Sequence, residues 1–166
     1  IPDEQTTSKT PWWLILLRSV LAALILVALA QPVVNPAQGL DISGNMRLVI
    51  ENGWDAGQTW HRQIQVAEHL LDQAERDKRE IYILTTAPDP GQAEPAQQGP
   101  MTAAQARTIL RGLKPRAWPA DAPAAALVLN KNRATGGIHS FWIGTGLDSG
   151  RGTELANTLQ RQGGLT

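Results

Sequence analysis

The sequence predicts an α/β protein: one N-terminal transmembrane helix, then a single domain with a mostly parallel sheet flanked by helices. Two observations lead to this prediction. Residues 12–30 form a long apolar run with a single charge, and from residue 45 onward short β-rich segments alternate with helical patterns. The organisation we expect is an N-terminal flank at 1–11, the membrane helix at 12–30, a linker at 31–44 and the α/β domain at 45–166.

The apolar run reads WWLILLRSVLAALILVALA. As a helix it would be about 28 Å long, at roughly 1.5 Å per residue, which is close to the hydrocarbon thickness of a bilayer. Trp12 and Trp13 stand at one end, where indoles favour the headgroup region. Arg18 is interpreted as a flank residue that snorkels toward that end; the alternative is a functional charge inside the membrane.

Two other interpretations of the apolar run are weighed against a membrane helix. Residues 28–30 match the A-x-A cleavage site of a signal peptide, and a buried core helix is disfavoured by the lack of a polar face.

Basic residues give this helix a direction. Lys9 and Arg18 lie toward its N-terminal side, and the next basic residue is Arg47. The positive-inside rule therefore places the N-terminus in the cytoplasm and the α/β domain on the opposite side of the membrane.

Composition and motifs exclude several classes of function. Lys and Arg together number 15, as do Asp and Glu, so the chain is neutral and has no basic cluster for nucleic acid. It has no cysteine, which excludes a disulfide framework, a thiolate metal site and a cysteine nucleophile. Neither H-E-x-x-H nor G-x-S-x-G occurs, so hydrolase functions have little support. His61 and His69 lack the i, i+4 spacing that shares a metal, and His139 lies in a predicted strand. All three are interpreted as surface or packing residues.

The elements of the domain follow from hydrophobic periodicity and from the positions of Pro and Gly. Apolar residues in 59–78 recur at spacings of three and four, which predicts a helix. Thr102 and Asp121 are typical N-cap residues for two further helices. The predicted order is strand 46–50, helix 59–78, strand 80–86, an irregular loop 88–100, helix 101–113, an Ala-rich helix within 119–130, strand 137–143 and helix 153–162.

Strands separated by helices need crossover connections, so we expect a parallel sheet that is covered on both faces. Three strands are few for such a sheet, which is therefore either incomplete or completed by other sequence or by a partner. Ligands of these sheets bind at the carboxyl ends of the strands, which here means the loops after Ile50, Thr86 and Ile143. The first loop carries Glu51 and Asp55, and a carboxylate pair can hold a divalent cation.

Three segments resemble a known family. The apolar run ends in LALAQPVVNP, the first strand ends in ENGWD at 51–55, and WPAD follows at 118–121. From about residue 11 to residue 152 the chain is similar to bacterial BatA-type proteins, which join an aerotolerance-regulator N-terminal region to a Rossmann-like von Willebrand factor A-like domain. It resembles most the subfamily that usually carries a C-terminal DUF4159 domain.

The resemblance implies a metal-ion-dependent adhesion site, from which this sequence departs. The family pattern is Asp-x-Ser-x-Ser after the first strand, a Thr in a middle loop and an Asp after a later strand. The residues at or near these positions are Glu51, Gly53, Asp55, Ala120 or Asp121, and Thr145. Mg²⁺ requires near-ideal octahedral geometry at about 2.0–2.1 Å, so we expect a degenerate site without a metal. The alternative role of Glu51 and Asp55 is to cap the helix that begins near Thr59.

A Gly-rich segment between the last strand and the last helix is a candidate anion loop, with residues Gly144, Gly146, Ser149 and Gly150. Backbone N–H groups and a helix N-terminus together favour a phosphate. The segment departs from G-x-G-x-x-G at Ser149, so the alternative is a flexible loop with helix-capping residues.

Two tryptophans, Trp54 and Trp60, bracket the first loop. An exposed aromatic side chain near a crevice is a candidate anchor for a partner, and core packing is the alternative.

The function that we expect is a non-enzymatic, membrane-anchored protein-interaction module of a bacterial cell-envelope assembly. Its domain would lie in the periplasm, its partners would be the lipid bilayer and other envelope or membrane proteins, and it would need no cofactor. The alternative is a metal- or nucleotide-dependent activity at the Glu51/Asp55 loop or the 144–152 loop.

Overall fold

The computed structural model describes residues 11–29, 44–132, 136–146 and 150–166, with backbone only for 26–29. The chain divides into two compact units, Ile1–Asp41 and Ile42–Thr166, and each is described by itself. Most of the predicted flank 1–11 and of the predicted linker 31–44 lies outside the described residues.

The first unit contains helix α1, Trp12–Leu29, so the predicted helix is confirmed. Pro11 precedes it, and the Leu14 N–H donates to the Pro11 carbonyl at 2.9 Å, in line with the preference for Pro at helix starts. Large apolar side chains of α1 are exposed: Trp12, Trp13, Ile15, Leu16, Leu17, Val20, Leu21, Leu24 and Ile25. Among the described residues, no helix combines the length and the apolar character that crossing a membrane requires.

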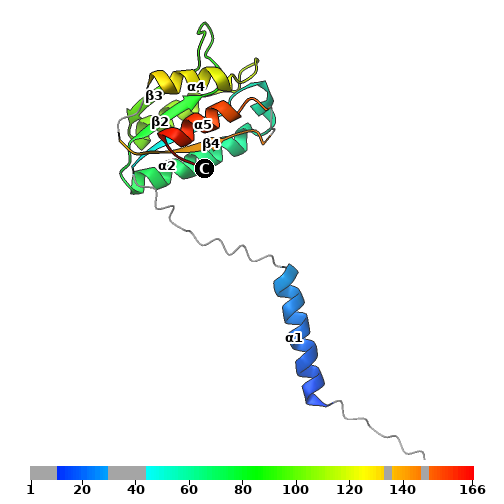
Figure 1. The fold of residues 1–166 in the computed structure, drawn as a ribbon. Coiled ribbons are helices and arrows are strands. Elements are labelled where there is room, and N and C mark those ends of the chain that lie inside the picture. The colour runs from blue at the N-terminus through cyan, green and yellow to red at the C-terminus, as the bar shows by residue number, and fades with distance from the viewer. Residues whose placement is uncertain (1–10, 30–43, 133–135, 147–149) are drawn as a thin grey trace, which may run out of the picture. The chain divides into compact units, whose positions relative to one another are not determined.

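The second unit is built on a five-stranded sheet with the order β3-β2-β1-β4-β5 (Figure 1). The three predicted strands are present as β1 (Asn45–Ile50), β2 (Ile81–Thr85) and β4 (Ile138–Ile143). β1 is central and pairs in parallel with both β2 and β4. The prediction of a mostly parallel sheet is therefore confirmed.

Both edge strands were missed by the sequence prediction. β3, Gln97–Met101, pairs antiparallel with β2 in a segment where we expected only an irregular loop. Its side chains are largely exposed and include Pro100, which an edge strand tolerates because one side of its backbone faces away from the sheet. The loop prediction is therefore wrong for residues 97–100, and Met101, the predicted first residue of the next helix, belongs to β3.

β5, Gly163–Leu165, pairs in parallel with β4 at the other edge of the sheet. Its glycines allow a close approach: a β-carbon on Gly163 would lie 1.7 Å from the Ile138 carbonyl oxygen. The two edge strands extend the three expected strands to five, and both come from the chain itself.

Helices cover both faces of the sheet (Figure 1). α2, Trp60–Arg76, and α3, Ala103–Gly112, pack on one face. α4, Ala122–Lys131, and α5, Thr153–Gln162, pack on the other. All four were predicted, with ends that differ by at most a few residues.

Caps explain where two of these helices begin. The Thr102 Oγ1 accepts from the Gln105 N–H at 3.4 Å, while the Gln105 Oε1 accepts from the Thr102 N–H at 3.0 Å, which is a capping box for α3. The Asp121 Oδ1 accepts from the Ala124 N–H at 3.0 Å at the start of α4. Both predicted N-caps are confirmed.

The central strand, β1, contains a buried charged residue, Arg47. Arg47 is fully buried, and its Nε, Nη1 and Nη2 atoms have no hydrogen-bond partner among the described residues. It shares a sheet face with Val49 of the α4/α5 core, because alternate residues of a strand point to the same side. Its register neighbours are Tyr82 of β2 and Ser140 of β4. Burial lowers the pKa of Arg47 to about 10, partly offset by the nearby Tyr82.

Candidate functional site

The carboxyl ends of β1, β2 and β4 meet at one edge of the sheet, as the parallel order predicts. The Glu51 N–H donates to the Ile143 carbonyl at 3.1 Å, and the Thr86 N–H donates to the Ile50 carbonyl at 3.2 Å. The three loops that we expected to form the site therefore leave the sheet side by side.

Asn52 joins the first loop to two others, a role that the sequence did not suggest. Its Oδ1 accepts from the Ala87 N–H at 2.8 Å, and its carbonyl accepts from the Arg116 N–H at 2.7 Å. Asn52 is fully buried, and within the part of the chain that the structure describes its Nδ2 has no hydrogen-bond partner. The Thr86 carbonyl in turn accepts from the Asp121 N–H at 2.8 Å. These bonds hold residues 51–58, 86–89 and 114–121 together.

Glu51 is held by the loop that follows β4. Its Oε2 accepts from the Thr145 N–H at 2.9 Å, which joins two of the predicted site residues across 94 positions of sequence. Burial raises the pKa of Glu51; the Thr145 hydrogen bond lowers it, and the charge of Asp55 raises it further. Glu51 and Asp55 are therefore close enough to repel each other.

The alternative role of Glu51 and Asp55, as caps of α2, is wrong. The N-cap of α2 is Thr59, which makes no side-chain cap bond. Between the loop and α2 lies a short 3-10 helix, η1, Trp54–Gln58, with Asp55 in its first turn.

Two of the predicted adhesion-site residues, Gly53 and Asp121, have structural roles. A β-carbon on Gly53 would lie 2.6 Å from the Ala120 backbone nitrogen and 2.8 Å from Asp55 Oδ1, so this position has room only for glycine. The Asp121 carboxylate accepts the hydrogen bond that caps α4. Glu51, Gly53, Asp55 and Thr145 are thus brought together, while Asp121 borders them. Within the described ranges, no group of three Asp, Glu or His side chains is arranged to hold a metal ion.

Two tryptophans are exposed at this end of the domain. Trp54 is 67% exposed and Trp118 is 36% exposed. The Trp54 N–H donates to the Trp118 carbonyl at 3.0 Å, and the Trp118 Nε1 donates to the Pro88 carbonyl at 3.1 Å. We call the surface formed by these two residues and their segments, 51–58 and 114–121, the tryptophan face.

The two predicted partner contacts have different environments. Trp54 belongs to the tryptophan face, whereas Trp60 is partly buried and packs against the α2/α3 core. Trp118 was not predicted as a contact, because nothing local in the sequence places it beside Trp54.

The predicted anion loop is described in part, since Ser149 lies outside the described residues. Gly146 and Gly150 have φ values of +82° and +67°, which favour glycine. A β-carbon on Gly144 would lie 3.0 Å from Glu51 Oε2, and one on Gly152 would lie 2.7 Å from the Trp142 ring. These last two glycines accommodate side chains of the protein itself.

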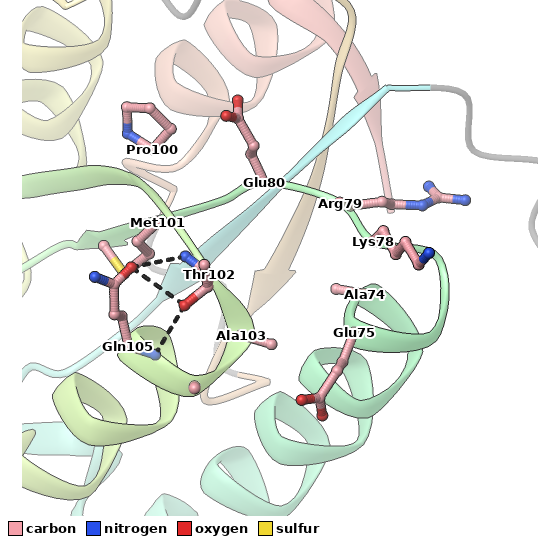
Figure 2. Close-up of a pocket in the computed structure, with 11 residues that line it drawn as sticks. Ala74, Glu75, Lys78, Arg79, Glu80, Pro100, Met101, Thr102, Ala103 and Gln105 are labelled. Carbon is pink, nitrogen blue, oxygen red and sulfur yellow. Dashed lines mark hydrogen bonds between the residues drawn. The ribbon is translucent and has the colours of Figure 1, made fainter.

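A pocket of about 430 Å³ lies at the opposite end of the sheet from these loops, near the start of β2, where α2 ends and α3 begins. Figure 2 shows the capping box of Thr102 and Gln105 on one side of it, with Lys78 and Arg79 extending away from Thr102. Arg79 pairs with Asp77 at 2.9 Å, and Glu75 and Glu80 also line the pocket. Its charges are mixed, and they do not converge on the helix start.

A second pocket, of about 570 Å³, lies between α2 and β4. Its lining is mainly apolar and includes Val66, Leu70, Phe141 and Ile143, and it ends at Thr145 beside the predicted site. It therefore borders the carboxyl-end loops.

None of the histidines enters the carboxyl-end site. His61 and His69 are exposed on α2. The His139 Nε2 lies 2.9 Å from Thr166 Oγ1, and the His139 ring packs against Phe141 with centroids 5.0 Å apart. Burial, and secondly the charge of Arg79, lower the pKa of His139.

Comparisons with models of protein families, with curated proteins and with solved structures found no match to this chain.

Proposed function

We propose that this chain is a membrane-attached, non-enzymatic protein-interaction module of a bacterial cell-envelope assembly, and that it binds its partner through the tryptophan face. The supporting observation is the exposure of Trp54 beside Trp118. Large aromatic side chains are the commonest hot spots of protein interfaces. Here they stand on loops that hydrogen bonds anchor to the ends of three strands, so a partner would meet a largely preorganised surface.

The rest of the proposal draws on sequence. The α/β order and the segments 51–55 and 118–121 support a von Willebrand factor A-like domain with a degenerate adhesion site. The glycine at position 53 and the cap at Asp121 support an interaction role over metal binding, because both side-chain positions are committed to local structure.

Membrane attachment is proposed for residues 12–30, with the α/β domain in the periplasm. It is supported by the apolar run, by the exposed apolar side chains of α1 and by the basic residues Lys9 and Arg18. The test is alkaline carbonate extraction of membranes from cells that express the chain. Retention in the membrane pellet is expected, and release into the supernatant would contradict attachment.

The interaction is tested by capturing proteins from solubilised inner membranes with the chain as bait. Trp54→Ala and Trp118→Ala are compared with Leu127→Ala, which removes another exposed apolar side chain, 54% exposed, from α4. Loss of a hot spot costs about 2 kcal/mol, or about 30-fold in affinity. We expect each tryptophan variant to lose the proteins that the wild type and Leu127→Ala retain. Equal capture by all variants would contradict the proposal.

A further inference from the structure

The tryptophan face carries excess negative charge. Its segments, 51–58 and 114–121, contain three acidic and two basic residues, which gives a net charge of −1. One of the two bases, Arg116, forms an ion pair with Asp89. With Arg116 paired, the face holds three acids, Glu51, Asp55 and Asp121, against one base, Lys114, so a partner of opposite charge would fit this surface.

None of these three acids pairs with a cation in the described part of the chain. The ion pairs found there involve Asp72, Glu75, Asp77, Asp89 and Glu94. Glu51 and Asp121 accept backbone hydrogen bonds from Thr145 and Ala124. Asp55, which follows the exposed Trp54 in sequence, has neither kind of partner there.

The position of Asp55 makes a cation favourable. Its charge adds to the effect of burial in raising the pKa of Glu51, and no basic side chain of the described residues forms an ion pair with either carboxylate. A cation placed against Trp54 would be attracted both by these carboxylates and by the negative face of the indole.

Resting on the proposed function, we propose that the partner presents a lysine or arginine side chain, which lies against Trp54 and pairs with Asp55. Trp118 borders the same contact through its backbone bond to Trp54. The partner is therefore a protein with an exposed basic segment, and binding should weaken as salt screens the charges.

The experiment titrates the chain 1–166 with two capped tripeptides, acetyl-Gly-Arg-Gly-amide and its norleucine analogue, which has an uncharged apolar side chain. The indole N–H signals in ¹H–¹⁵N spectra report on each tryptophan, and the partly buried Trp60 and Trp142 serve as internal controls. We expect the arginine peptide alone to shift the Trp54 signal saturably. The apparent affinity should fall at least ~3-fold in 0.5 M NaCl and in Asp55→Asn.

Asp55→Asn keeps the shape of the side chain and removes its charge, and the Trp60 and Trp142 signals report whether the variant stays folded. Equal shifts with both peptides, or no shift of Trp54 at all, would overturn the cationic partner. If Trp54→Ala still loses membrane-protein capture in that case, the proposed function stands without it. If capture by Trp54→Ala is unchanged, the proposed function fails whatever the peptides do.

Discussion

Replacing Arg47 by Met should stabilise the domain, although it removes a fully buried side chain from the central strand. In the described ranges of the chain, the three guanidinium nitrogens of Arg47 have no hydrogen-bond partner. An unpaired buried charge opposes folding, and apolar replacements of buried charges are often neutral or stabilising. Met has a long, flexible side chain that can occupy much of the same space.

The magnitude follows from the pKa of Arg47, which burial lowers to about 10 in the folded protein. At about 1.4 kcal/mol per pKa unit, keeping the guanidinium charged in the fold costs about 3 kcal/mol. The space that Met leaves unfilled should cost about 1 kcal/mol. The net gain in the free energy of unfolding is then about 2 kcal/mol, or a rise in Tm of about 8 °C at about 4 °C per kcal/mol.

The sign of the pH dependence is also determined. Because the folded pKa of Arg47 lies below the unfolded one, the penalty is fully present below pH 10 and disappears only as pH rises from about 10 toward the unfolded pKa. The difference between Arg47→Met and the wild type should therefore be constant from pH 6 to pH 9.

Urea denaturation followed by circular dichroism measures the effect, with Arg47→Lys as the control that keeps a cation at the same position. Lys should give no gain. If Arg47→Met lowers the free energy of unfolding by more than about 1 kcal/mol, then the buried guanidinium contributes to stability and the reasoning is refuted.

Four further predictions test the site and its surroundings. Burial raises the pKa of Glu51, so the folded state holds a proton more tightly than the unfolded state does. The free energy of unfolding therefore falls as pH rises from 4.5 through the folded pKa. Glu51→Gln should remove that fall in urea midpoints measured from pH 4 to 7, and an unchanged fall would contradict the prediction. Gly53→Ala places a β-carbon 2.6 Å from the Ala120 nitrogen and should cost about 1–3 kcal/mol in unfolding free energy, whereas an unchanged Tm would show that the loops yield freely. Thr102→Ala removes the capping box of α3 and should cost about 1 kcal/mol by the same measurement; no loss would mean that the cap is dispensable. Magnesium chloride or ATP at millimolar concentration should leave Tm within about 1 °C, and a larger rise would favour a metal- or nucleotide-dependent function.

The main helices and the three central strands could be predicted because their signals are local. Strand β1 is a run of apolar residues around Arg47, and α2 repeats its buried residues at helical spacing. The edge strands lack such signals. β3 contains Pro100 and exposes most of its side chains, and β5 is two glycines and a leucine. What defines both strands is backbone pairing with a neighbour that is distant in sequence.

The candidate site, too, could be predicted in part and depends for the rest on contacts between distant segments. The rule that parallel strands end at one edge predicted that the loops bearing Glu51 and Thr145 would meet, and they share a hydrogen bond. The roles of Asn52 and Trp118 could not be predicted, because each depends on a bond to a distant segment. The burial of Arg47 follows from a sheet that is covered on both faces, but the lack of a hydrogen-bond partner among the described residues depends on distant segments and could not be predicted.

Hydrogen–deuterium exchange of the chain, free and bound to the proteins it captures from solubilised membranes, tests the tryptophan face most directly. The account predicts that binding slows exchange chiefly in residues 51–58 and 114–121, and that α4 around Leu127 is unaffected. Protection confined to the opposite end of the sheet, around the pocket between Glu75 and Gln105, would contradict it.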